Sequence, residues 1–381
     1  MNRYAAALSS HPSAFEAVGE VAGEVLERLD GDPPDLLVCF ASPHHVGVFE
    51  DVAAGLRKLL DPRALVGCTA VAVAGGGREI EDAPAISVFA ARFPAGRVEA
   101  FALDAHAAPD GYRVTGWPDD VPDRGTLVML ADPFSFPVPD VLAACNEGAP
   151  GLAVVGGLAS SARGPGGNRL ALGDRVASTG CVAVLCSEEI PVRTVVSQGC
   201  RPIGRPLTVT RAERNLLLEL AGRPAVERLQ EVVVAADEAE RDLMRQGLHV
   251  GVVVDEHRSD FGRGDFLVRN VLGADRRTGA LAVGDVVEVG RTVQFHVRDA
   301  ASADEDLRHL LAGVEGAGAL LFTCNGRGQA LFGAPHHDAA AVEEIVGPVP
   351  LAGAFCAGEI GPVGGRNFLH GFTASVAVFD R

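Results

Sequence analysis

LLFTCNGRGQALFG, from Leu320 to Gly333, and GAFCAGEIGPVGGRNFLHGFT, from Gly353 to Thr373, decide how this chain folds. In the first stretch an apolar run ends at Cys324 and gives way to a glycine-rich loop that carries Arg327. This change predicts a buried strand that opens into a loop with one fixed positive charge. A second apolar run ends beside Glu359, which supplies the opposite charge. Because glycine lets a backbone approach a ligand closely, the two strand ends predict a concave binding site.

The charged side chains at these strand ends are the first candidates for ligand binding. Arg327 could grip a carboxylate through two hydrogen bonds, and Glu359 could receive an ammonium group, so the pair would suit an amino acid. In the alternative, the two side chains bridge each other and hold two loops together. Arg269 falls inside a strand pattern, where a long charged side chain must face solvent or a polar cavity. The predicted ligand-binding residues are Cys324, Asn325, Arg327, Gly328, Gly358, Glu359, Arg269 and His370.

Composition narrows the class of partner. The chain has 381 residues, with 33 basic and 50 acidic side chains and a formal net charge of -17. This charge repels phosphate backbones and anionic lipid, so nucleic acid and membrane surfaces are not expected partners. The N-terminus has no signal-peptide pattern, and no apolar run reaches the roughly 18 residues of a membrane helix. We therefore expect a cytoplasmic protein, in agreement with eight sparse cysteines that lie mostly in apolar, strand-like runs.

The same order of elements recurs along the chain. Residues 36–91, 126–187 and 318–380 each read as a strand, a helix, a second strand that ends in small residues, a loop and a third apolar strand. The repetition predicts equivalent glycine-rich strand ends that gather at one edge of the sheets. The high proportion of strand favours a mixed α+β fold in which mixed sheets carry helices outside, an α-β-β-α layering. The alternative is one doubly wound parallel sheet.

The length of the chain suggests about two domains on a prior of roughly 150 residues each. A break near Glu189 to Gln198 fits such a division. We expect two domains of similar size, residues 1–190 and residues 191–381.

Several motifs together resemble one known family. They are GCTA with GGGREIEDAP, LALGDRVA, QGCRPIG, LLLELAGRPA, DFLVRNVLGAD, GRTVQFHVRDA, CNGRG and GAFCAGEIGP, in this order over almost the whole chain. The chain resembles FIST-domain proteins, its first half the FIST N-terminal domain and its second half the FIST C-terminal domain. The resemblance implies a bacterial sensory module that binds small molecules such as amino acids. In relatives such modules accompany histidine kinases, chemotaxis receptors or nucleotide cyclases. Because the two regions use the length of this chain, we expect a separate signalling protein, such as a kinase or receptor, to receive its signal.

Two other functions remain open. A branch of the family is described as haem-binding nitric-oxide sensors, and His296 or His370 would be the axial ligand, although a lone histidine in a strand is more often a core residue. Cys324 would be the nucleophile of a hydrolase if His336, His337 and Asp338 activated it, but a core thiol that closes a strand is the simpler interpretation. The sequence has no nucleophile elbow, Walker loop, His-Glu-x-x-His helix or Cys-x-x-Cys pair. We therefore expect neither an enzyme nor a metal protein. The sequence identifies neither the ligand nor the oligomeric state.

Overall fold

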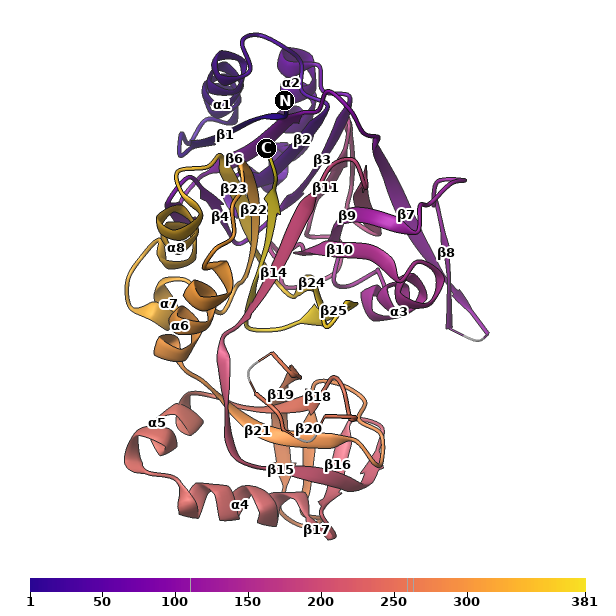
Figure 1. The fold of residues 1–381 in the computed structure, drawn as a ribbon, viewed down its shortest axis with the longest axis vertical. Helices are drawn as coiled ribbons and strands as arrows, with labels where there is room; N and C mark the ends of the chain where they lie inside the picture. Colours follow the sequence, from indigo (N-terminus) through magenta and orange to yellow (C-terminus); the bar gives the residue numbers. More distant parts are fainter. Residues whose placement is uncertain (110, 259, 263) are drawn as a thin grey trace. The chain divides into compact units, whose positions relative to one another are not determined.

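The computed structural model describes residues 1–109, 111–258, 260–262 and 264–381, and the chain divides into two compact units (Figure 1). Unit 1 consists of Met1–Val196, Leu307–Leu369 and Thr373–Arg381, and unit 2 consists of Ser197–Asp306 and His370–Phe372. These units do not coincide with the consecutive ranges 1–190 and 191–381. The difference arises because strands from both ends of the chain share sheets in unit 1, so that the segment of unit 2 interrupts unit 1 in sequence.

Each of the three sheets of unit 1 is built on a β-α-β passage whose two strands pair in parallel. These pairs are β2 (Leu36–Ala41) with β3 (Ala64–Thr69), β9 (Arg124–Ala131) with β10 (Gly151–Leu158), and β22 (Gly318–Cys324) with β23 (Leu351–Cys356). A third strand returns antiparallel to the first in each case: β6 (Ile86–Arg92), β13 (Cys181–Ser187) and β26 (Thr373–Phe379). We call these passages repeats 1, 2 and 3. They confirm the predicted repetition and the mixed sheets, and the alternative of one parallel sheet is wrong.

Each repeat also sends a hairpin to the sheet of another repeat. The hairpin that follows the second strand of repeat 1 pairs with β23, that of repeat 2 pairs with β3, and that of repeat 3 pairs with β10. The hairpin strands are β4 (Ala72–Gly75) and β5 (Arg78–Glu81), β11 (Leu170–Leu172) and β12 (Arg175–Ala177), and β24 (Glu359–Val363) and β25 (Arg366–His370). The exchange closes a ring of three repeats. The outer strands are β1 (Arg3–Ser9), β7 (Val98–Ala108), β8 (Gly111–Thr115) and β14 (Val192–Gln198).

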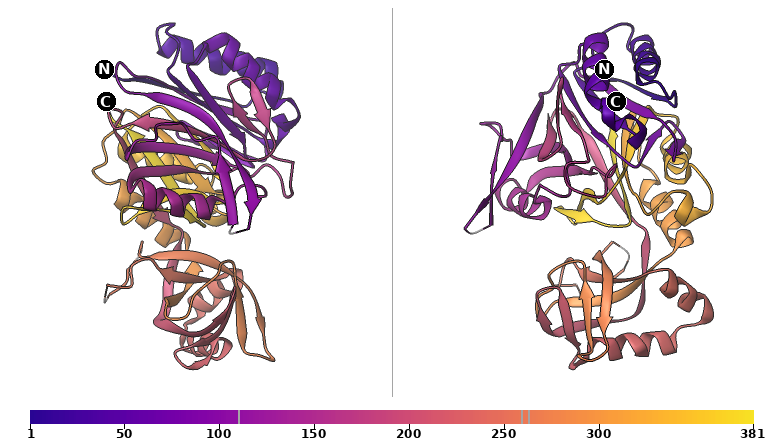
Figure 2. Two further views of the ribbon diagram at one scale, coloured as in Figure 1. Left: turned by 90° about the vertical axis from the view of Figure 1, so that its right-hand side faces the viewer. Right: turned by 180° about the vertical axis from the view of Figure 1, so that it is seen from behind.

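Helices cover the outer faces of the three sheets, while their inner faces share one core (Figure 2). Phe40, Val128 and Phe322, one from the first strand of each repeat, are fully buried in this core. The layering of helices outside sheets is therefore as predicted, with a third sheet added. The helices are α1 (Ala14–Arg28), η1 (Pro43–Val48), α2 (Phe49–Leu60), α3 (Val138–Gly148), α6 (Ala300–Leu311), α7 (Gln329–Phe332) and α8 (His337–Val346).

Unit 2 contains a seven-stranded sheet in the order β15-β21-β18-β19-β20-β16-β17. A separate core that includes Val250, Leu281 and Phe295 holds this sheet against two helices. The elements are β15 (Cys200–Glu213), β16 (Leu216–Leu220), β17 (Arg223–Pro224), α4 (Ala225–Ala235), α5 (Glu238–Gln246), β18 (Leu248–Val253), β19 (Phe266–Asp275), β20 (Ala280–Val283) and β21 (Thr292–Arg298). Among the described residues of both units, no helix has the length and apolar character needed to cross a bilayer.

Candidate ligand-binding site

The second strands of the three repeats end beside one another. Ser160, which follows β10, joins all three: its hydroxyl donates to the carbonyl oxygen of Phe355 in repeat 3 and accepts from the Val71 amide of repeat 1 at 2.9 Å. The Ser160 amide also donates to the Thr69 carbonyl oxygen, at 3.3 Å. The repetition therefore brings three equivalent strand ends together, as the sequence predicted.

The equivalent positions in repeats 1 and 2 carry local polar networks. After β9, the buried Asp132 accepts hydrogen bonds from Asn168 Nδ2 at 2.9 Å and from Ser135 Oγ at 2.7 Å. After β2, Ser42 Oγ accepts from the Ala85 amide at 2.9 Å. The buried His45 of repeat 1 leaves Nε2 without a hydrogen-bond partner, but burial lowers the pKa of this imidazole and so keeps it neutral. Neither network contains a buried cation.

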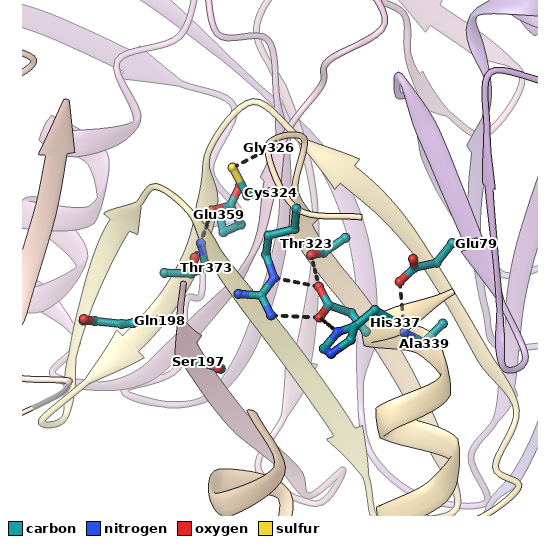
Figure 3. Close-up of polar contacts among 12 residues, drawn as sticks. Glu79, Ser197, Gln198, Thr323, Cys324, Gly326, His337, Ala339, Glu359 and Thr373 are labelled. Carbon is teal, nitrogen blue, oxygen red and sulfur yellow. Dashed lines mark hydrogen bonds and ion pairs between the residues drawn. The ribbon is translucent and has the colours of Figure 1, made fainter. Parts of the chain in front are cut away.

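Repeat 3 differs because it buries an arginine. Arg327, 1% exposed, follows β22 and holds Asp338 at the start of α8 through two hydrogen bonds, from Nε to Oδ2 at 2.7 Å and from Nη2 to Oδ1 at 2.8 Å. Thr323 and His337 approach the same carboxylate from two sides (Figure 3). Thr323 Oγ1 donates to Oδ2 at 2.5 Å, and His337 Nδ1 lies 3.0 Å from Oδ1. The His337 ring stacks on Phe332 with a centroid distance of 3.3 Å. This arrangement fixes the loop that carries Arg327 against α8.

The Arg327–Asp338 pair is charged at neutral pH. Burial alone would raise the pKa of Asp338, but the Arg327 charge and the hydrogen bonds outweigh burial and hold this pKa well below its ordinary value. The bidentate grip that the sequence predicted for Arg327 therefore exists, but it holds a carboxylate of the chain itself. The third guanidinium nitrogen, Nη1, is buried and has no hydrogen-bond partner among the residues that the structure describes.

Glu359, at the start of β24, is fully buried beside this pair. Its Oε2 accepts hydrogen bonds from the Thr373 amide at 3.1 Å and from Thr373 Oγ1 at 2.9 Å, whereas the buried Oε1 has no such partner in the described part of the chain. Burial raises the pKa of Glu359 to about 8, although Thr373, Arg327 and the Cys324 thiol all favour the ionised form. The carboxyl group is therefore protonated at pH 7. Because Arg327 pairs with Asp338, the two charges singled out from the sequence do not bridge each other.

A third buried carboxyl group, Glu79, arrives with the hairpin of repeat 1. Its Oε1 accepts from the Ala339 amide in the first turn of α8 at 3.0 Å, and its Oε2 is buried without a hydrogen-bond partner. Burial, together with the nearby Asp338 charge, raises the pKa of Glu79 to about 8. Glu79, Thr323 and Thr373 were not among the residues predicted from the sequence to bind ligand. The signals for Glu79 were its place in a short, mostly polar run after three glycines and in the motif GGGREIEDAP.

The other predicted residues of these two loops lie at different depths. Asn325 is exposed, and its backbone amide donates to the Cys356 carbonyl oxygen at 2.8 Å. Gly358 is buried. Gly328 adopts a φ of 63°, and a Cβ atom there would lie 2.8 Å from the Glu81 carboxylate, so this turn requires glycine. We call residues 324–328 and 357–359 the third edge.

Arg269 and His370 belong to unit 2 and not to the unit that contains Arg327 and Glu359. Arg269 Nε pairs with Asp285 Oδ2 at 2.7 Å, and only 17% of the Arg269 side chain is exposed. This ion pair is local to the sheet of unit 2.

The surroundings of His296 do not fit a haem group. Its ring is 1% exposed and meets Phe266 edge to face at a centroid distance of 4.8 Å, and a Cβ atom added to Gly251 would lie 2.3 Å from His296 Cε1. Nδ1 lies 3.0 Å from the Gln294 carbonyl oxygen. A porphyrin bound to this imidazole would have to displace these neighbours. His370, the other haem candidate, is 4% exposed at the end of β25.

The groups proposed to activate Cys324 have contacts of their own. His336 Nδ1 accepts from the Glu79 amide at 2.9 Å, and Asp338 is held by Arg327. The Cys324 thiol itself accepts from the Gly326 amide at 3.4 Å. These contacts favour the interpretation of Cys324 as a buried thiol that closes β22.

The raised pKa of Glu359 makes stability depend on pH. The pKa is about 8 in the folded chain against an ordinary value of 4.5, so the stability associated with protonated Glu359 is complete below pH 4.5 and is lost as pH rises to about 8. Glu359→Gln imitates the protonated group at every pH. We expect the free energy of unfolding of the variant, minus that of the wild type, to increase by about 1.4 kcal/mol for each unit that the pH rises between 4.5 and about 8. Urea denaturation at a series of pH values measures the difference, and a constant difference would contradict the prediction. Glu343→Gln on the exposed side of α8 serves as the control.

The class of this protein is defined by three β-α-β repeats in a closed ring, with buried and incompletely paired polar groups at one strand edge. Comparison with known families assigns the chain to a family. The model of the FIST N domain matches residues 35–223, and that of the FIST C domain matches residues 225–362. The chain belongs to the FIST family. FIST domains are associated with sensory signal transduction and small-ligand binding rather than with catalysis.

Similar full-length proteins occur in mycobacteria. An uncharacterised protein of Mycobacterium bovis is 46% identical over 374 residues, which cover 97% of this chain and 96% of the relative. An uncharacterised protein of Mycobacterium tuberculosis is 44% identical over 383 residues, 99% of each chain. The similarity therefore extends over both FIST domains.

Proposed function

We propose that this protein is a small-molecule sensor whose ligand binds at the third edge, between Arg327 and Glu359. The observation that carries the proposal is that two polar atoms there, Arg327 Nη1 and Glu359 Oε1, are buried and have no hydrogen-bond partner among the described residues. Glu79 Oε2, against the first turn of α8, is a third buried atom in the same state. An unpaired buried polar group costs about 1–3 kcal/mol, so a ligand that satisfies such groups recovers that free energy. At the equivalent positions, repeat 2 has Asp132, whose carboxylate accepts hydrogen bonds, and repeat 1 has the neutral Ser42.

The chemistry of the third edge favours a ligand that carries both an acceptor and a cationic or neutral donor. Arg327 Nη1 presents a donor from a guanidinium already oriented by Asp338. Glu359 is protonated when the edge is closed, and an ammonium group beside it would favour ionisation. An amino acid has both groups. The acidic side chains are almost inaccessible to solvent. Binding therefore requires the two loops of the third edge to open, at the exposed residues Asn325 and Ala357.

A thermal-shift screen of the standard amino acids and related metabolites tests this function. A ligand at about one hundred times its Kd stabilises the folded chain by about 2.7 kcal/mol. We expect such a ligand to raise the Tm of the wild type and of Glu343→Gln, and to raise the Tm of Glu359→Gln much less. Equal shifts in all three proteins would remove Glu359 from the site.

The pH dependence of binding identifies the ammonium group. A ligand that ionises Glu359 releases one proton, so its affinity should rise about tenfold per pH unit below pH 8. Isothermal titration at pH 6 and pH 7 measures this slope in the wild type. In Glu359→Gln the slope should vanish, and a slope that persists in the variant would assign the proton to another group.

The output of the sensor is part of the same proposal. We expect a separate cytoplasmic signalling protein, such as a kinase or receptor, to receive the ligand state. Opening of the loop at the third edge would expose the start of α7 and α8, because Glu79 and Glu81 cap these helices from the hairpin of repeat 1. The ligand state would therefore change a surface formed by two repeats.

A further inference from the structure

The outer face of α1 and α2 carries an apolar groove that unit 1 leaves open. Its volume is about 720 Å³. Phe15 at its rim is 84% exposed, and Leu59 is 49% exposed. The other residues that the argument uses are Val18, Gly19, Asp51, Gly55 and Lys58. A contiguous exposed apolar surface of this kind usually indicates an interaction site.

We propose that this groove is the interface of a symmetric dimer, in which α2 crosses α2 of a second copy in antiparallel orientation and Phe15 of each copy enters the groove of the other. The proposal concerns assembly and does not depend on the ligand proposed for the third edge. In a twofold interface the same patch must fit itself, so a projecting group and a hollow must lie side by side on one face. Phe15 and the groove meet this condition.

The charges of α2 fit a twofold contact. The first turn of α2 is acidic, with Glu50 and Asp51, and the last turn is basic, with Arg57 and Lys58. In an antiparallel crossing centred between residues 54 and 55, Asp51 of one copy faces Lys58 of the other, and symmetry forms this contact twice. Both residues line the groove, and Lys58 is the only lysine of the chain.

The backbones can approach closely at the centre of such a crossing. Ala54 is exposed and Gly55 is its neighbour, so the middle of α2 presents small side chains. On α1, a Cβ atom added to Gly19, which lines the groove, would meet no atom within 4 Å. Small residues at a helix crossing allow short interaxial distances, and the aromatic ring of Phe15 would then fill the remaining hollow.

A second copy explains the groove better than a basic helix of another protein or a free apolar molecule. With a net charge of -17, two copies repel over most of their surfaces, so a stable contact needs local charge complementarity. Two of the acidic side chains of α1 already have partners on their own chain: Glu20 accepts from Ser9 Oγ, and Glu24 pairs with Arg28 at 2.6 Å. Opposed charges at the two ends of α2 also complement the dipole of the helix itself, but Asp51 and Lys58 both line the groove, where a copy of α2 would pair each with its opposite.

A charge-exchange experiment on the full chain tests the dimer. Light scattering coupled to size exclusion should show twice the chain mass for the wild type at about 100 μM, above the micromolar range in which the weaker standard-sized interfaces dissociate. Asp51→Lys and Lys58→Asp should each weaken dimerisation by tenfold or more, because each places like charges opposite one another. An equimolar mixture of these two variants should dimerise again, since each then offers the charges that the other lacks.

Phe15→Ser tests the apolar half of the contact, with circular dichroism as the check of folding. It should also weaken the dimer by tenfold or more, whereas Leu272→Ser, at a residue of unit 2 that is 63% exposed, should not.

The reactivity of Lys58 gives a second measurement. In the dimer Lys58 should react more slowly with an amine-directed acylating reagent than in Phe15→Ser. A monomeric wild type would overturn the proposal, as would single-charge variants that dimerise normally or a mixture that stays monomeric. Restoration by mixing would not occur if a foreign helix or an apolar molecule were the natural occupant.

Discussion

Asp338→Asn is expected to lower the free energy of unfolding by about 3–5 kcal/mol, because it leaves the guanidinium of Arg327 buried without its counter-charge. The Arg327 side chain is 0% exposed and that of Asp338 is 1% exposed, so water cannot replace the lost partner in the folded state. Arg327→Met should have an effect of similar size, since it strands the carboxylate instead. Denaturation by guanidinium chloride near pH 7 measures the free energy of unfolding of both variants.

The pair Arg308–Glu344 provides the matched control. It joins α6 to α8 at 2.8 Å, but its side chains are 43% and 61% exposed. Breaking it with Arg308→Met should change stability by less than about 1 kcal/mol, as for other exposed ion pairs. In the double variant Arg327→Met with Asp338→Asn, neither charge remains, so the loss should be clearly smaller than the sum of the single losses. Additive losses would show that the two side chains act independently.

Gly156→Ala is expected to destabilise the chain by several kcal/mol. Gly156 in β10 has a φ of 148°, and a Cβ atom there would lie 1.9 Å from the Met129 carbonyl oxygen, which belongs to the neighbouring strand. Backbone strain of about 1–3 kcal/mol and overpacking of about 1–3 kcal/mol would act together. Because Gly156 also faces Ile360 of the hairpin from repeat 3, the substitution should loosen the ring of repeats.

Gly23→Ala is the control for this substitution. Gly23 lies inside α1 but does not line the groove between α1 and α2, and a Cβ atom there would meet nothing within 4 Å. Alanine should therefore stabilise the helix by about 0.5–1 kcal/mol. Thermal unfolding of both variants separates the effect of position from that of the methyl group. A mild effect at Gly156 would mean that β10 adjusts to the added atom.

Most of the fold of unit 1 could be predicted from local pattern. Apolar runs that stop at glycine or a small residue gave the strands, and their repeated order gave the three β-α-β passages. The hairpin exchange could not be predicted, because the sequence of β4 does not contain the identity of its partner β23, which lies more than two hundred residues further along. That long-range pairing is also why the compact units are discontinuous in sequence.

In the candidate site, too, single residues could be predicted from the local sequence, whereas their contacts could not. Arg327 and Glu359 could be found from sequence because a charge at the end of a buried apolar run is conspicuous. Their partners could not be assigned, because periodicity does not pair Arg327 with Asp338, 11 residues on, or Glu359 with Thr373, 14 residues on. Glu79 could not be placed near them, since it lies 260 residues from its contact at Ala339. The depth of the site was also hidden, since residue type does not show whether a charge at a strand end reaches solvent.

We expect ligand to bind at the third edge and not at the equivalent edges of repeats 1 and 2. Hydrogen exchange with and without the ligand that raises the Tm most distinguishes these sites. Bound ligand should slow exchange at residues 324–329 and 357–361 and change it little at residues 42–48 after β2 or 132–137 after β9. Slower exchange at the edges of repeats 1 or 2, or within residues 197–306, with none at the third edge would exclude the third edge as the binding site.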